Sequence, residues 1–288
     1  SLLMNAFNFI PHWRMDDLLV SYSQPGAGVG AHIDQYDVFI VQGKGTRRWQ
    51  VGDKSMKYAK YYPHPKLQQI DEFEPIIDVE LLPGDILYIP PGFPHKGQSI
   101  TECMNYSVGF RAPDQTELFQ AIADDLLDSD KLTRRFIDRN RTYIDRPSAI
   151  SPKDIMLLKQ LLQQYVTNTQ IDQVLTQHLS KQNEYLDAFP LETPLPSSYI
   201  LALINQGVTL QLACGVRPVY LDYQVDDEFI FFINGHKFST SATARLETSR
   251  LLDNHQTFIK FNAELTHDWI ELIRELINLG YLEIVEED

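Results

Sequence analysis

Short strand patterns separated by glycine and proline constrain the possible fold more than any other feature of this chain. These patterns occur within the first 111 of its 288 residues. Turn-forming groups such as Pro83-Gly84-Asp85 and Gly43-Lys44-Gly45 lie between them. Many short strands joined by such turns favour a β-barrel or sandwich. The expected strands cover residues 18–23, 32–42, 46–51, 76–81, 86–89 and 103–110.

Helical periodicity replaces the strand pattern after residue 111. A helix is expected to begin near Asp114 and to carry Leu118, Ile122, Leu126 and Phe136 on one face. Two more amphipathic helices are expected, one over 152–166 after Ser151 as N-cap and one over about 171–189. These segments suggest a helical region whose apolar stripes pack on each other or on a second copy of the chain.

The last third of the chain mixes helix and strand patterns after a proline- and serine-rich linker at 190–198. The order of elements suggests a small α+β unit, similar to a winged helix. We therefore predict three parts: residues 1–112, 113–195 and 196–288. The elements expected in the third part are helices at 199–205 and 266–278, strands at 209–213, 219–223, 229–233 and 281–285, and a turn at Asn234-Gly235.

The net charge of −14 argues against a general nucleic-acid binder. Residues 196–288 carry 6 basic and 14 acidic side chains. A wing that holds DNA should be basic, so this charge favours a role in structural support or partner docking. The acidic surface suits a basic partner, although simple solvation explains it equally well. No apolar run approaches the roughly 20 residues of a membrane span, no signal peptide is visible, and Cys103 and Cys214 have no metal-ligand spacing. These features predict a cytoplasmic protein with reduced thiols.

Two histidines and one aspartate form the strongest chemical pattern. His32 and Asp34 lie two residues apart in an expected strand, so their side chains point to the same face. His95 ends the proline-rich turn Pro90-Pro91-Gly92-Phe93-Pro94 and supplies a second imidazole. Two histidines and one carboxylate on one face leave positions open on a metal, as in non-haem Fe(II) oxygenases. The other histidines (His12, His64, His178, His236, His255 and His267) are interpreted as surface or turn residues.

Arg47 shares a strand face with Trp49 and Val51, which predicts a guanidinium inside the barrel. A buried charge requires a partner. That partner is either the distal carboxylate of 2-oxoglutarate or a carboxylate of the protein itself. Their positions in the expected strands predict that the side chains of Ser21 and Asn105 also point inward. There they either contact the same carboxylate or form hydrogen bonds within the protein, as buried polar residues do. The glycines at 26–30 follow a strand but precede no helix, so they indicate close backbone approach beside the site and not a nucleotide loop.

These residues together resemble the JmjC-type 2-oxoglutarate oxygenases, and in particular the bacterial ribosomal oxygenases. The resemblance covers most of residues 18–111. It rests on Pro25 to Phe39 (PGAGVGAHIDQYDVF), on Gly45 to Trp49 (GTRRW), on Pro83 to His95 (PGDILYIPPGFPH) and on Asn105 to Arg111 (NYSVGFR).

The resemblance implies that His32, Asp34 and His95 bind Fe(II) and that Arg47 and Ser21 bind 2-oxoglutarate, with dioxygen as the second cosubstrate. It also implies a double-stranded β-helix (jelly-roll, cupin-like) barrel, a helical dimerisation region and a winged-helix domain, in that order. The substrate expected from the family is an arginine of a large-subunit ribosomal protein. Tyr36 and Asp37, which follow the H-x-D motif, are candidates for receiving its guanidinium. Arginine at position 47 is typical of the bacterial branch, because eukaryotic relatives have lysine there. Family members carry more chain before the H-x-D strand, including further barrel strands, so the resemblance leaves open whether these residues form the whole barrel and substrate groove.

Two other functional classes remain open from the sequence. One is a cupin-like metal enzyme that acts on a small molecule without 2-oxoglutarate, in which Arg47 is incidental. The other is a non-catalytic interaction scaffold. Within the oxygenase class, lysine demethylation is distinguished from hydroxylation by the release of formaldehyde.

Overall fold

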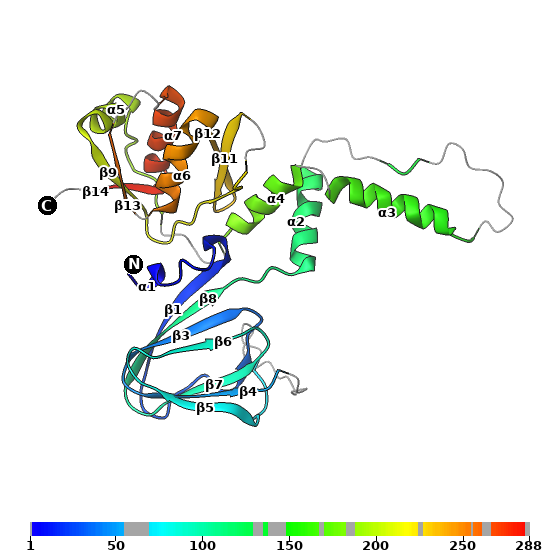
Figure 1. The fold of residues 1–288 in the computed structure, drawn as a ribbon, viewed down its shortest axis with the longest axis vertical. Helices are drawn as coiled ribbons and strands as arrows, with labels where there is room; N and C mark the ends of the chain where they lie inside the picture. The colour runs from blue at the N-terminus through cyan, green and yellow to red at the C-terminus, as the bar shows by residue number, and fades with distance from the viewer. Residues whose placement is uncertain are drawn as a thin grey trace. The chain divides into compact units, whose positions relative to one another are not determined.

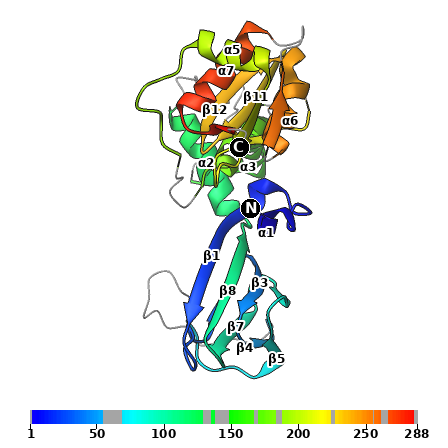
Figure 2. The ribbon, with the colours of Figure 1, turned by 90° about the vertical axis from the view of Figure 1, so that its left-hand side faces the viewer.

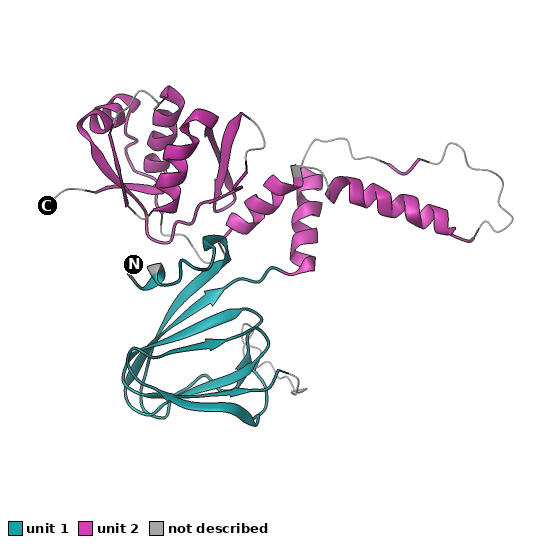
Figure 3. Ribbon diagram, in the orientation of Figure 1, with its two compact units in different colours: residues 1–113 teal, residues 114–288 magenta. Residues whose placement is uncertain are grey.

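The computed structural model describes residues 2–54, 69–128, 135–137, 148–166, 170–182, 188–223, 227–254, 256–260 and 266–285. The chain divides into two compact units, residues 1–113 and 114–288 (Figure 3). The described helices include no segment with the length and hydropathy of a membrane span.

The first unit consists of two four-stranded antiparallel sheets (Figure 1). One has the strand order β1-β8-β3-β6 and the other the order β2-β7-β4-β5. Strands β1 and β8 run side by side for most of their length (Figure 2). The bounds are β1 Met15–Ser23, β2 His32–Ile33, β3 Asp37–Lys44, β4 Arg47–Gly52, β5 Pro75–Leu81, β6 Ile86–Ile89, β7 Pro94–Ser99 and β8 Cys103–Phe110.

Side chains on one face of each sheet form the core of this unit. On β4, Trp49 and Val51 are buried while Arg48 and Gln50 are more exposed, as the period-two pattern requires. Val38, Ile40 and Ile89 supply buried residues of the same cluster from the other sheet. Phe7 packs with Val108 and Phe110 in a second cluster, so the short segments α1 (Leu2–Asn5) and η1 (His12–Arg14) belong to this unit.

The second unit contains helices and two three-stranded sheets, with the orders β10-β11-β12 and β13-β9-β14. Its core includes the buried Trp269, Ile273 and Leu276 of helix α7, whose start is capped by Thr266. The helices are α2 Gln115–Asp128, α3 Pro152–Val166, α4 Gln170–Ser180, α5 Ser197–Gln206, α6 Arg245–Asp253 and α7 His267–Asn278, with the short η2 at Ala242–Ala244. The strands are β9 Val208–Leu212, β10 Val219–Tyr220, β11 Glu228–Ile233, β12 His236–Ser241, β13 Gln256–Ile259 and β14 Leu282–Val285.

Several expected elements differ in length from those observed. The helix over 152–166 is confirmed, and Ser151 caps it by accepting the backbone N–H of Asp154. The next helix ends at Ser180 and not near residue 189. Its end is fixed by tertiary partners, because the Ser180 hydroxyl accepts the N–H of Gly235 and Asn234 accepts that of Gln182. Phe136 lies outside α2, and β10 is shorter than the expected strand. The single strand expected over 32–42 is divided into β2 and β3, and Asp34 lies in the bend between them and not in a strand.

Candidate active site

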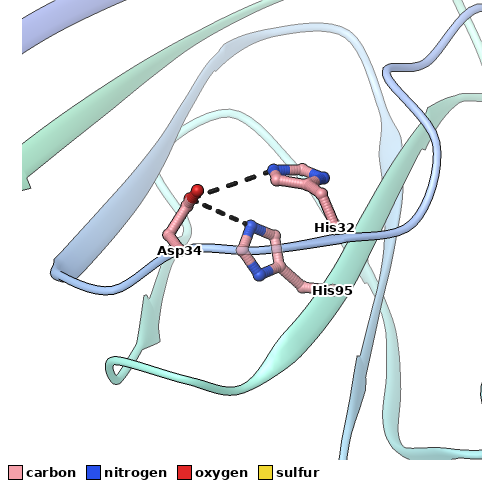
Figure 4. A group of neighbouring side chains, drawn as sticks. All are labelled: His32, Asp34 and His95. Carbon is pink, nitrogen blue, oxygen red and sulfur yellow. Dashed lines mark ion pairs between the residues drawn. The ribbon is translucent and has the colours of Figure 1, made fainter. Parts of the chain in front are cut away.

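His32 and His95 are direct partners in the antiparallel pairing of β2 with β7. Direct partners project from the same face of a sheet, and the centres of the two imidazole rings lie 4.2 Å apart. Asp34 follows His32 by two residues and turns its carboxylate to the same point (Figure 4). The pairing therefore brings together three side chains that are remote in sequence.

The three side chains form a compact group of potential metal ligands. The Asp34 Oδ2 atom lies 3.8 Å from the His32 Nε2 atom and 3.4 Å from the His95 Nε2 atom. One donor atom from each residue lies within 4.8 Å of the others. His95 is 2% exposed and His32 9%.

Hydrogen bonds orient both imidazoles for metal binding. The Nδ1–H of His32 donates to the carbonyl oxygen of Gly30, and that of His95 donates to the carbonyl of Phe93, each over 3.0 Å. A carbonyl oxygen only accepts, so the proton is on Nδ1 and the Nε2 lone pair faces Asp34.

The charge states suit a divalent cation. Burial lowers the pKa of His32, and His95 lowers it further, which favours the neutral imidazole that binds metals. Burial alone raises the pKa of Asp34, but a hydrogen bond from His95 and the charges of the two imidazoles, both of which act when these rings are protonated in the absence of a metal, outweigh it. The net pKa of Asp34 is lower than usual, so the carboxylate is ionised. Two neutral imidazoles and one carboxylate fit a non-haem iron or similar transition metal.

Arg47 is a buried cation without a carboxylate partner among the described residues. Its side chain comes from β4 and is 4% exposed. It donates from Nη1 to Asn105 Oδ1 (2.6 Å) and from Nη2 to the carbonyl of Gly97 (3.3 Å). Its Nε–H has no acceptor. Burial lowers the pKa of Arg47, yet a guanidinium stays charged in proteins. The described part of the chain thus offers no support for a structural salt bridge at this position.

Ser21 and Asn105 lie beside Arg47, as direct partners in the pairing of β1 with β8. The Ser21 hydroxyl donates to Asn105 Oδ1 over 2.7 Å and lies 3.4 Å from Arg47 Nη1. Asn105 is 3% exposed. Its side-chain oxygen therefore already holds the guanidinium in place.

Tyr36 and Asp37 were expected to be candidates for receiving a cationic substrate group. Asp37 is engaged within the protein, because it accepts hydrogen bonds from Arg14 (2.7 Å) and Tyr88 (2.6 Å). Burial raises the pKa of Tyr36, and the carboxylates of Asp34, Asp17 and Asp16 raise it further. Asp17 and Tyr36 both approach the Cα of Gly109.

Asp17, which the sequence did not single out, thus lies beside Tyr36. The register of β1 is irregular between Met15 and Leu18, so strand alternation could not predict which way Asp17 points.

Two glycines allow close packing beside Arg47, in agreement with the expected backbone approach. A Cβ atom on Gly28 would lie 2.3 Å from the carbonyl oxygen of Gly97. One on Gly97 would lie 2.8 Å from Arg47 Nε and 2.8 Å from the Trp49 ring. The glycine-rich turn thus lies directly against β7, and β7 against Arg47.

The remaining titratable residues of the sequence analysis lie apart from this group. Asp85 accepts the backbone N–H of Leu82, as expected of a turn residue. His12, His236 and His267 are exposed. His178 lies within α4 and pairs with Glu117 over 2.9 Å, so it is not a turn residue. His64 and His255 lie outside the described residues.

Two family models match the chain. The JmjC domain matches residues 2–118, and the ROXA-like winged helix matches residues 158–283. The first match contains all the residues of the candidate active site.

Curated relatives include the ribosomal protein uL16 3-hydroxylase of Escherichia coli, which is 38% identical over 97% of this chain and 73% of its own length. A probable ribosomal oxygenase of Haemophilus influenzae is 37% identical over 56% of this chain and 41% of its own length.

Solved structures of the E. coli protein YcfD superpose closely on this one. One aligns with a TM-score of 0.87 and 36% identity over 98% of this chain and 74% of the other. Another, described as a ribosomal oxygenase in complex with cobalt and 2-oxoglutarate, gives a TM-score of 0.82 and 35% identity over 99% and 74%. The match in sequence and structure over nearly the whole chain shows that it belongs to the JmjC-type ribosomal oxygenases of the bacterial YcfD-like group.

Proposed function

We propose that the chain is an Fe(II)- and 2-oxoglutarate-dependent protein hydroxylase that acts on an arginine side chain of a ribosomal protein. The observation that carries this proposal is the buried Arg47, which has no carboxylate partner among the described residues and projects, like the metal-ligand group, from the β2-β7-β4-β5 sheet. A metal site alone would suit many cupin-like enzymes. A buried guanidinium near it, with no carboxylate partner among the described residues, favours an anionic ligand as its partner.

His32, Asp34 and His95 hold the iron, and their fixed orientation leaves the remaining positions for cosubstrates. Bound iron, 2-oxoglutarate and dioxygen supply the oxidation, in which the cosubstrate becomes succinate and carbon dioxide and the substrate gains a hydroxyl group. Arg47 receives the distal carboxylate of 2-oxoglutarate. Ser21 and Asn105 contribute to the same pocket, and Asn105 fixes the guanidinium by accepting from Nη1.

Acidic and aromatic groups beside the metal group favour a guanidinium substrate. Asp17 and Tyr36 lie over Gly109, and the charges of Asp16 and Asp34 act on the same tyrosine. A carboxylate forms a bidentate pair with a guanidinium, and an aromatic face stacks on it. The net charge of −14 attracts a basic ribosomal protein. The name of the E. coli relative gives uL16 as the protein to test first.

The sheet orders support a double-stranded β-helix barrel for residues 1–112, because successive strands alternate between the two sheets along most of that unit. We also propose the helical region at 113–195 and the winged-helix unit at 196–288. Apolar side chains exposed along α3 support a homodimer formed through the helical region; they include Ile155, Met156, Leu158, Leu162 and Val166. The acidic charge of the third part supports a role without direct nucleic-acid binding. We place the protein in the cytoplasm, together with its ribosomal-protein substrate.

The test incubates the protein with Fe(II), 2-oxoglutarate and a bacterial uL16 protein, and maps any added oxygen by tandem mass spectrometry. We expect one oxygen on an arginine and an equal amount of succinate. Reactions that lack 2-oxoglutarate, or that contain the His95→Ala protein, serve as controls. Oxygen on another residue type contradicts the arginine assignment, and formaldehyde release would indicate demethylation.

Replacing Gly97 with alanine is expected to raise the KM for 2-oxoglutarate about tenfold with a smaller change in kcat. The new Cβ would overlap both Arg47 Nε and the Trp49 ring, so one of them must move. Gly43→Ala is the matched control, because its Cβ would crowd Tyr106 within the other sheet of this unit. An equal rise in KM for the control would show that general loosening, and not displacement of Arg47, causes the effect.

A further inference from the structure

Two N–H groups on β4 are buried without an acceptor among the described residues. They are Arg47 Nε and Trp49 Nε1. The two side chains are 4% and 5% exposed. The guanidinium has an assigned ligand in the proposed function, whereas the indole has none.

The two donors are neighbours on one face. Residues 47 and 49 alternate with the outward Arg48, and the Arg47 guanidinium carbon lies 5.0 Å from the centre of the Trp49 ring. Both side chains pack over Gly97, whose Cβ would lie 2.8 Å from Arg47 Nε and 2.9 Å from indole Cε2, the carbon bonded to Nε1. The Trp49 ring also lies 6.2 Å from the ring of the metal-ligand candidate His95. The indole therefore lies near both the Arg47 guanidinium and the metal-ligand candidate His95.

Buried N–H groups are nearly always hydrogen-bonded, because burial removes the water that would otherwise accept from them. Trp269, the other described tryptophan of the core, follows this rule by donating to Thr248 Oγ1 over 3.1 Å. The indole N–H of Trp49 is an exception, because it has no acceptor among the described residues. The neighbouring Nε–H of Arg47 is a second exception of the same kind. Two adjacent unpaired donors, one of them cationic, are complementary to the several lone pairs of a carboxylate.

We propose that the Trp49 indole N–H donates a hydrogen bond to the distal carboxylate of 2-oxoglutarate, alongside Arg47. This inference rests on the proposed function and adds a positioning residue to it. Succinate keeps the same distal carboxylate, so Trp49 holds the product as well as the cosubstrate. A 2-oxo acid without that carboxylate, such as 2-oxobutyrate, has no group to accept this hydrogen bond, so Trp49 does not strengthen its binding.

The direct test is the indole ¹⁵N–¹H spectrum of the Zn(II)-loaded protein. The chain has 3 tryptophans, so the resonance of Trp49 is assigned by its loss in Trp49→Phe. We expect this resonance to shift on addition of 2-oxoglutarate or succinate and to stay in place with 2-oxobutyrate. The resonance of Trp269 is expected to stay in place throughout. A Trp49 resonance that remains unmoved when 2-oxoglutarate binds overturns the proposal and leaves ordered water as the acceptor.

Calorimetry with the same Zn(II)-loaded protein gives the second measurement. Trp49→Phe is expected to weaken binding of 2-oxoglutarate and succinate about tenfold and to leave 2-oxobutyrate unchanged. Trp269→Phe, which removes an indole N–H that is satisfied within the protein, is the matched control. Equal losses for all three ligands would mean that Trp49 only supports the fold. If the unmodified protein binds no 2-oxoglutarate at all, the proposed function fails too, whereas binding without a Trp49 effect refutes this inference alone.

Discussion

Replacement of His95 with alanine is expected to abolish succinate formation, with turnover reduced about a thousandfold or more. His95 is the most buried member of the metal-ligand group, and its Nε2 atom faces Asp34 over 3.4 Å. Without it, only one imidazole and one carboxylate remain to bind the metal. Metal affinity should fall by more than the roughly 10–100-fold that is typical when a group behind a ligand is lost.

Succinate release and metal retention after gel filtration measure the two effects of the His95 substitution. His236→Ala provides the control, because His236 is an exposed histidine at the start of β12. It should leave both quantities unchanged. Turnover above about a tenth of normal in the His95→Ala protein would exclude this residue as a metal ligand.

Replacement of Arg47 with methionine is expected to weaken 2-oxoglutarate binding about a hundredfold, or ~2.7 kcal/mol. The cause is the loss of a buried cation that faces the distal carboxylate. The apparent KM for 2-oxoglutarate and its directly measured Kd should rise together. Retention of the metal is expected to be unaffected, since Arg47 is not among the potential metal ligands.

The stability of the Arg47→Met protein separates a ligand-binding arginine from a structural one. Breaking a buried salt bridge within the protein costs about 3–5 kcal/mol. Replacing a buried charge that has no carboxylate partner by an apolar group removes the cost of burying that charge, which offsets the lost hydrogen bonds to Asn105 and Gly97. We therefore expect the free energy of unfolding without ligands to stay within about 1 kcal/mol of normal or to increase. A loss of 3 kcal/mol or more in chemical denaturation would support the structural reading.

The neighbouring Arg48→Met is the matched control for both measurements. Arg48 points outward and donates to the two oxygens of Asp78 over 2.6 and 2.5 Å. An exposed pair of this kind contributes less than about 1 kcal/mol. Neither the affinity for 2-oxoglutarate nor the free energy of unfolding should change appreciably.

Local periodicity was sufficient to orient only some residues of the candidate site. Alternation along β4 correctly placed Arg47 inward and Arg48 outward. His32 and Asp34 do come together, but β2 ends at Ile33, so the backbone after the strand and not strand alternation places Asp34. The prediction that His95 joins them depended on a motif, and the pairing of β2 with β7 brings the three together. Such pairings are not encoded by the spacing within either strand.

Sequence patterns did not predict the features that depend on contacts between distant segments. Helix α4 ends where Asn234 and Gly235 of another segment meet it, so its own apolar pattern overestimated its length. Asp37 was predicted to be a substrate contact, but its carboxylate already accepts hydrogen bonds from Arg14 and Tyr88. Asp17 comes beside Tyr36 through the packing of both side chains over Gly109, which no spacing within one strand predicts.

The direct pairing of His32 with His95 also determines when the iron site appears during folding. The backbone ladder between β2 and β7 sets the separation of the two imidazoles, and these strands are far apart in the chain. Contacts between distant segments form late, because a long loop must close first. An unfolded or nascent chain is therefore expected to hold no assembled site, so a bound metal stabilises only the folded state. Metal uptake should therefore follow closure of the β2-β7-β4-β5 sheet.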